Sequence, residues 1–175
     1  MNCQLFDLKK IAVKFAILFC ILFILDYTLG TTLKYYYFKN TSGLFYRTTY
    51  VIDSTSAETL VFGSSRANHH YVPQVFEDEL NSTFYDCGRD GVGLIFEAAL
   101  VKAVTKRYKP KRIILDLLPN EFSYDETDKL SPLLPYKNNP AIYPFILENS
   151  SFEPIKLLSR IYPYNSMLST IIIGN

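Results

Sequence analysis

The sequence predicts an α/β protein in which an N-terminal transmembrane helix precedes a three-layer domain built on a parallel sheet. Two observations lead to this prediction. Almost every residue from Ile11 to Leu29 is apolar, and about 20 such residues are what a helix needs to cross a bilayer. Farther along, short apolar runs alternate with segments of helical periodicity, which is typical of parallel strands joined by right-handed crossovers.

The flanks of the N-terminal segment predict its orientation. Lys9, Lys10 and Lys14 cluster on its amino side, and aromatic residues gather at 35–38 beyond its other end. The positive-inside rule and the aromatic belt both place the N-terminus in the cytoplasm and the domain outside the cell membrane. A cleaved signal peptide is the alternative, because a signal peptide and an uncleaved anchor both begin with a basic region that is followed by an apolar one. The sequence 28–30 is a poor cleavage site, which favours an uncleaved anchor.

The length of 175 residues accommodates one domain besides the anchor. We expect a cytoplasmic tip and anchor at 1–30, a juxtamembrane connector at 31–57 and the α/β domain at 58–175. We expect the stretch 58–175 to be the N-terminal part of that domain. The net charge of +1, with acids and bases interspersed, gives no electrostatic footprint for nucleic acid. The three cysteines lack metal-ligand spacing, and we expect neither a metal nor a cofactor.

The stretch Gly63-Ser64-Ser65-Arg66 organises the predicted domain. It follows an apolar run at 59–62 that predicts a buried strand, and it precedes apolar positions at helical spacing between 72 and 80. The two serines therefore lie where a strand passes into a helix, at the carboxyl edge of the sheet. Backbone N–H groups and a helix dipole at such a corner favour a developing oxyanion. Either serine could instead cap the helix.

Two more strands and several connections complete the prediction. The expected elements are strands at 83–87 and 112–118 and helices at 94–108 and 154–161. The strand at 112–118 is expected at the centre of the sheet, because its run is almost continuously apolar. The polar, proline-rich region 123–153 predicts a long loop or lid. The final apolar run at 167–173 fits a helix or a strand.

Three loops converge at the carboxyl edge of this sheet, at 63–65, 88–91 and 119–121. In an open parallel sheet that edge binds ligands. A hydroxyl, a glycine amide and an asparagine side chain there would supply a nucleophile and oxyanion donors, which are the parts of an acyl-transfer site. From residue 58 to 122 these blocks resemble the SGNH or GDSL-like hydrolases, particularly the membrane-anchored cell-envelope members, whose domain is flavodoxin-like.

The resemblance implies roles for three residues and a substrate class. Ser65 would be the nucleophile, Gly91 the oxyanion-hole glycine and Asn120 the asparagine of the family's third block. The implied activity is that of an esterase or O-acyltransferase acting on acylated envelope glycans, with an envelope acyl-transfer protein as a candidate partner. The family's final Asp-x-x-His is not found in this sequence. We therefore expect either a base supplied by further sequence or a non-catalytic module that binds a glycan or a protein.

His69 and His70 come shortly after Ser64 and Ser65, the pair at the end of the strand that we call the serine corner. His69 lies four residues after Ser65, one helical turn away, and is a candidate substitute base. Both histidines are otherwise candidates for substrate contact. Adjacent histidines lack the i, i+4 spacing that brings two imidazoles to one metal, so we expect no zinc site.

Each of two charged residues near the predicted site has two possible roles. Arg66 either contacts an anionic substrate or pairs with Glu77 or Asp90. Asp116, within an apolar run, is either a site carboxylate with a raised pKa or a hydrogen-bonded structural acid. Gly91 and Asn120 also fit simple turn roles.

Overall fold

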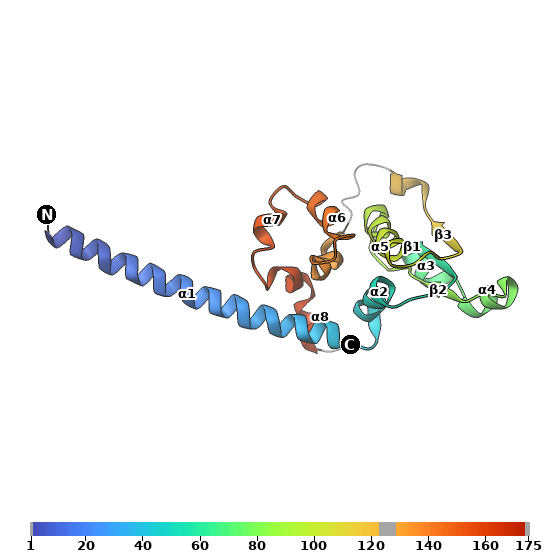
Figure 1. Cartoon of the computed structure of the whole chain (residues 1–175), viewed down its shortest axis with the longest axis horizontal. Helices are drawn as coiled ribbons and strands as arrows, with labels where there is room; N and C mark the ends of the chain where they lie inside the picture. The colour runs from blue at the N-terminus through green and yellow to red at the C-terminus, as the bar shows by residue number, and fades with distance from the viewer. Residues whose placement is uncertain (1, 123–128, 174–175) are drawn as a thin grey trace.

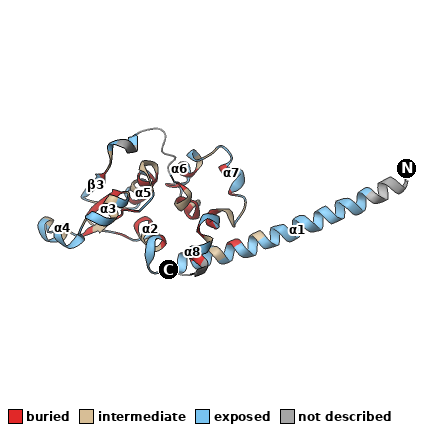
Figure 2. Cartoon of the chain, turned by 180° about the vertical axis from the view of Figure 1, so that it is seen from behind, coloured by how far each residue is buried: buried red, intermediate tan, exposed pale blue. Residues whose placement is uncertain are grey.

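The computed structural model describes residues 2–122 and 129–173 (Figure 1). Helix α1 (Asn2–Lys39) runs as one long rod out of an α/β body. Large apolar side chains are exposed along α1 from Leu8 to Leu29, and burial begins only toward its C-terminal end (Figure 2). Within the described ranges, no helix combines the length and apolar character needed to cross a membrane. The expected transmembrane helix over 11–29 is therefore not shown.

The expected irregular connector at 31–57 is mostly helical. Helix α1 continues through Lys39, and helix α2 (Gly43–Asp53) follows after a short break. Helix α2 forms because Phe45 and the pair Val51 and Ile52 recur at helical spacing and bury one face. Tyr37, near the end of α1, is fully buried, and its ring centroid lies 4.8 Å from that of Phe45. The hydrophobic core thus begins before residue 58.

Among the described residues three parallel strands form the sheet, which confirms the predicted α/β class. Strand β1 (Thr59–Gly63) lies between β2 (Phe84–Asp86) and β3 (Arg112–Asp116). Thr59 aligns with Phe84 on one side and with Arg112 on the other. The expectation of a central strand at 112–118 is wrong, because β3 pairs only with β1 among the described strands. Accordingly, Ile113 and Leu115 are 37% and 50% exposed.

Helices cover both faces of β1. Leu60 and Phe62 point into the main core, which includes residues of α2 and of α5 (Leu94–Arg107). Val61 points to the opposite face, where it packs with Ala67 of α3 (Ser65–His70) and with Phe84. Helix α4 (Pro73–Leu80) contacts β2 on that side. Because successive side chains of β1 point to opposite faces of the sheet, helices pack on both faces and the domain has three layers.

The region after β3 has more structure than the expected loop at 123–153. Its elements are η1 (Pro119–Phe122), η2 (Ser131–Tyr136), α6 (Tyr143–Glu148), α7 (Glu153–Lys156), η3 (Tyr162–Met167) and α8 (Leu168–Ile173). Part of the expected loop, 123–128, lies outside the described residues. Leu133, Ile142 and Ile146 belong to the main core, so this region is packed. Helix α7 is shorter than the expected helix at 154–161, and the final run is helical.

Candidate functional site

Two glycines allow helix α3 to pack directly on the ends of the strands. A Cβ atom at Gly63 would lie 2.8 Å from both the Ala67 Cβ and the Asp116 carbonyl oxygen. A Cβ atom at Gly88 would lie 2.5 Å from the Asn68 backbone nitrogen. These distances are too short for any side chain, so both positions require glycine for steric reasons. The close approach sets the position of the α3 side chains over the carboxyl edge of the sheet.

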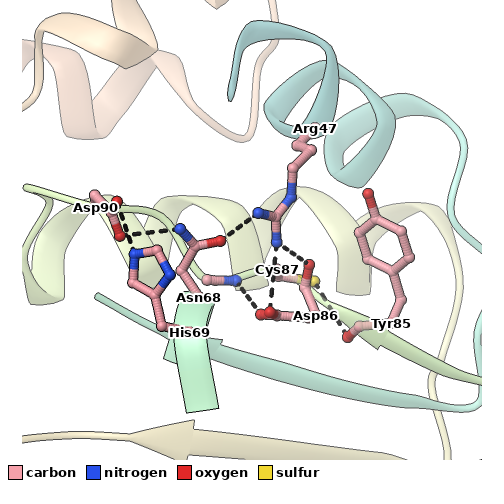
Figure 3. Close-up of polar contacts among 8 residues, drawn as sticks. Arg47, Asn68, His69, Tyr85, Asp86, Cys87 and Asp90 are labelled. Atoms are coloured by element: carbon pink, nitrogen blue, oxygen red, sulfur yellow. Dashed lines mark hydrogen bonds and ion pairs between the residues drawn. The ribbon is translucent and has the colours of Figure 1, made fainter. Parts of the chain in front are cut away.

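A hydrogen-bonded network lies at this edge (Figure 3). The His69 Nε2 atom lies 3.1 Å from Asp90 Oδ2, and Asn68 Nδ2 donates to Asp90 Oδ1 at 3.0 Å. Arg47, from α2, donates to Asn68 Oδ1 and so ties α3 to α2. The hydrogen bond from Asn68 and the contact with His69 hold the pKa of Asp90 below its ordinary value, although partial burial opposes this shift. Asp90 is thus a carboxylate that can orient the His69 imidazole.

Asp86, at the end of β2, contacts Arg47 of the same network and the turn after β2. Its Oδ1 accepts a hydrogen bond of 2.7 Å from the Gly88 N–H, and its Oδ2 lies 3.4 Å from a terminal nitrogen of Arg47. Burial nevertheless raises the pKa of Asp86, because the loss of water outweighs these two contacts. Asp86 therefore fixes the turn after β2 and the arginine that holds Asn68.

Ser65 is the first residue of α3 and is exposed. Ser64 occupies the N-cap position, but its side chain forms no capping hydrogen bond. His69 follows Ser65 by one helical turn, as the spacing predicts, yet no hydrogen bond joins these two side chains among the contacts of residues 2–122 and 129–173. The structure thus gathers a hydroxyl, an imidazole and a carboxylate on one helix and the adjacent turn.

The other predicted donors lie on neighbouring loops. Gly91 is exposed and has a φ of +69°, with no atom within 4 Å of a Cβ placed there. Its conformation requires glycine and fits a turn role, and its position next to Asp90 brings it to the same edge. Asn120 lies in η1, just after β3, but its side chain is outside the described residues. His70 is exposed at the end of α3.

Arg66 pairs with Asp116 rather than with Glu77 or Asp90. Its Nε donates to Asp116 Oδ1 at 2.7 Å, and a terminal nitrogen donates to the Leu117 carbonyl at 3.0 Å. The Asp116 side chain is 5% exposed. The structure therefore supports the interpretation of Asp116 as a hydrogen-bonded structural acid, which links α3 to the end of β3.

Sequence reasoning missed two arginines that shape this edge. Arg47 lies in the region assigned to a connector, where the seven-residue spacing of Phe45 and Ile52 was the one available sign of a helix. Arg89 is buried between the rings of Phe45 and Phe96, at 6.0 and 5.9 Å, and donates to Thr48 Oγ1. Burial lowers the pKa of Arg89. No sequence pattern distinguishes this buried arginine from an exposed one.

No protein-family model, curated protein or solved structure matches this chain. The fold and the site define its class from the structure alone: an α/β protein with a polar network over the carboxyl edge of a parallel sheet. Within the residues that the structure describes, no group of three His, Cys, Asp or Glu side chains is arranged to hold a metal ion.

Proposed function

We propose that this protein is a serine-dependent esterase or O-acyltransferase of the SGNH type that acts on acylated envelope glycans. One observation carries the proposal. The helix that begins at Ser65 also holds His69, whose imidazole lies 3.1 Å from the Asp90 carboxylate. A nucleophile, a base and a group that orients the base are the parts that acyl transfer requires.

The proposed step begins with attack by Ser65 Oγ on an ester carbonyl. As the new bond to the carbonyl carbon forms, the hydroxyl proton passes to His69 Nδ1, because Nε2 faces Asp90. The imidazolium then gives this proton to the departing alcohol, which leaves an acyl group on Ser65. The negative charge on the carbonyl oxygen would be stabilised by the N–H groups of Ser65 and Gly91 and by Asn120. Water or a glycan hydroxyl then accepts the acyl group.

Covalent labelling with a fluorophosphonate tests the nucleophile. We expect the full chain to be labelled and the Ser65→Ala variant to remain unlabelled, because the reagent reacts only with an activated serine. The neighbouring Ser64→Ala variant serves as the matched control and should keep its labelling. Equal labelling of the wild type and the Ser65→Ala variant would overturn the assignment.

The rate of labelling tests the base separately. Removing a general base typically slows such a reaction by about 10²-fold or more, so we expect this loss for His69→Gln. Asp90→Asn should show a smaller loss, since the imidazole remains but its orientation is less fixed. Asp78→Asn, at an exposed position of α4, is the control and should react at the wild-type rate. A wild-type rate for His69→Gln would remove His69 from the mechanism and leave the Ser65 assignment intact.

The proposal includes attachment of the protein to the cell membrane through α1, with the domain outside the cytoplasm. Its support is the series of large apolar side chains exposed from Leu8 to Leu29, of which Phe23 is 70% exposed. Such a surface is stable in contact with lipid and costly in water. Washing membranes at alkaline pH should leave the protein in the pellet, and protease added to intact cells should cleave its domain. Release by the wash would contradict the attachment.

A non-catalytic module that binds a partner through its sheet is a second candidate, and the edge strand favours it. Strand β3 leaves one edge unpaired within the described residues, and Leu115 is half exposed. Such an edge can pair with another chain. Sedimentation of the purified protein separates the candidates: oligomers that Leu115→Lys converts to monomers support this one. A cooperatively melting monomer contradicts it.

A further inference from the structure

A cavity of about 340 Å³ lies where α1 meets the C-terminal part of the chain. Its lining includes Lys34 of α1, Lys137 after η2 and Arg160 after α7, together with Thr31 and Asn138. None of the described residues that line it is an aspartate or a glutamate. Three cations therefore surround one small volume, and a hydroxyl and an amide add neutral hydrogen-bonding groups.

The charges of the cavity act on one another. Burial lowers the pKa of Lys137, and the positive charges of Arg160 and Lys34 lower it further, against the opposing effect of Asp26. A bound anion would relieve this repulsion. The Lys137 ammonium donates one hydrogen bond, of 2.7 Å, to the Leu157 carbonyl, and an ammonium has three donors. Its remaining donors are available to a ligand.

Contacts with α1 hold Arg160 at the rim of this cavity. Asp26 accepts hydrogen bonds from Ser159 Oγ at 2.5 Å and from the Arg160 N–H at 2.8 Å, so its carboxylate is already engaged. A Cβ atom at Gly30 would lie 2.4 Å from the Arg160 Cβ, which means that the loop packs directly on the helix. The Arg160 guanidinium also lies 4.2 Å from the ring centroid of Tyr27. The site is therefore preorganised by its neighbours.

We propose that this cavity binds a phosphate group through Lys34, Lys137 and Arg160. Arginine and lysine are the side chains that bind phosphate best, by paired hydrogen bonds and by charge. The cavity lies just past the last exposed aliphatic side chain of α1, since Leu29 is 51% exposed and Gly30 lines the cavity. An acyl chain lying along α1 would bring its phosphate to this level. The phosphate of a lipid headgroup is thus the favoured source, and inorganic phosphate is the other.

The test uses the full chain in detergent micelles and three probes. Dioleoylphosphatidic acid carries a phosphate, dioleoylglycerol has the same acyl chains without it, and inorganic phosphate has no acyl chain. Native mass spectrometry measures retention of each lipid, and calorimetry measures binding of inorganic phosphate. We expect retention of phosphatidic acid but not of dioleoylglycerol. Binding of inorganic phosphate with similar strength would support the site and assign it to the free ion.

Three variants locate the binding. Lys137→Gln and Arg160→Gln should each weaken binding about tenfold, as the loss of one charge-assisted hydrogen bond predicts. Lys34 is exposed on α1, so Lys34→Gln keeps the core intact and tests the site even if another variant fails to fold. Lys102→Gln, on the exposed face of α5, is the control. Equal retention of the two lipids without phosphate binding, or wild-type binding by all three variants, would overturn the proposal.

This proposal does not depend on the chemistry proposed for Ser65. The Ser65→Ala variant should bind phosphatidic acid as the wild type does. Loss of fluorophosphonate labelling and loss of phosphate binding are therefore separate results, and failure of one proposal leaves the other standing.

Discussion

Replacing Gly88 by alanine should destabilise the protein by crowding α3. The new Cβ atom would lie 2.5 Å from the Asn68 nitrogen, 2.8 Å from the Ala67 Cβ and 2.9 Å from the Ala67 carbonyl carbon. All three atoms belong to the backbone or to a Cβ, so no side-chain rotation relieves the clash. Helix α3 must then move outward, because Cβ contacts this short are not tolerated. Overpacking of this kind costs about 1–3 kcal/mol, and the backbone contacts place Gly88→Ala near the upper value.

Thermal unfolding of the full chain in detergent measures this cost. For a chain of this size, about 1 kcal/mol corresponds to roughly 2–4 °C in Tm, so Gly88→Ala should lower Tm by about 6–12 °C. Gly91→Ala is the matched control, because its Cβ meets open space and its cost is the left-handed φ alone, about 1–2 kcal/mol. If Gly88→Ala melted within about 2 °C of the wild type, the close packing of α3 on the turn after β2 would be refuted.

Three further predictions concern charged groups. Arg66→Gln leaves the buried Asp116 carboxylate without its cation, and we expect a loss of about 2 kcal/mol in a urea titration, limited by the partial exposure of the arginine. Burial disfavours ionisation of Glu153, but hydrogen bonds from Lys156, Tyr162 and Asn149 outweigh it and hold its pKa below the ordinary value. The ionised Glu153 carboxylate therefore stabilises the folded protein at neutral pH, and this stabilisation is lost as the pH falls through the lowered pKa. The urea midpoint should drop on acidification, and it should drop less in the Glu153→Gln variant. Asp26→Ala removes the acceptor for the N–H groups of Arg160 and Ile161, and hydrogen exchange of these two N–H groups should accelerate about tenfold.

Two of these predictions have a matched control, and the third has a result that would contradict it. Arg112 is exposed on the same sheet, and Arg112→Gln should change stability by less than about 0.5 kcal/mol. Asp78→Ala removes an exposed carboxylate of α4 and should leave exchange at 159–161 unchanged. An acid dependence that persists in full in Glu153→Gln would assign it to other carboxylates.

Local pattern was sufficient for the middle of the fold. The strands at 59–63 and 84–86 and the helix at 94–107 were predicted closely, because each has a strong apolar pattern bounded by a turn or a proline. The position of β3 was not predictable in this way. Its apolar run suggested burial on both faces, but strand order depends on pairing between distant segments, which periodicity does not encode. Helix α2 was missed because threonines and tyrosines, which have weak helical preference, separate its buried apolar residues Phe45, Val51 and Ile52.

The site was predictable in part. The four-residue spacing placed His69 one helical turn from Ser65, but helical periodicity was found only between 72 and 80, and α3 is a separate helix before it. The partner of His69 was not predictable, because Asp90 is 21 residues away and reaches it only through the turn at Gly88. The same holds for Asp116, which is 50 residues from Arg66. Contacts across the carboxyl edge follow from the stacking of α3 on the sheet and not from any local pattern.

The residues at the start of the α/β domain connect α1 to the serine corner. Tyr37 of α1 packs against Phe45 of α2, and its hydroxyl lies 3.2 Å from that of Tyr136 in η2. Arg47 of α2 in turn holds Asn68 beside His69. A continuous set of packed and hydrogen-bonded side chains therefore joins the end of α1 to the edge where Ser65 lies. If α1 is attached to a membrane, this connection gives the serine corner a fixed orientation toward the lipid surface, unlike the free rotation that a flexible connector would allow.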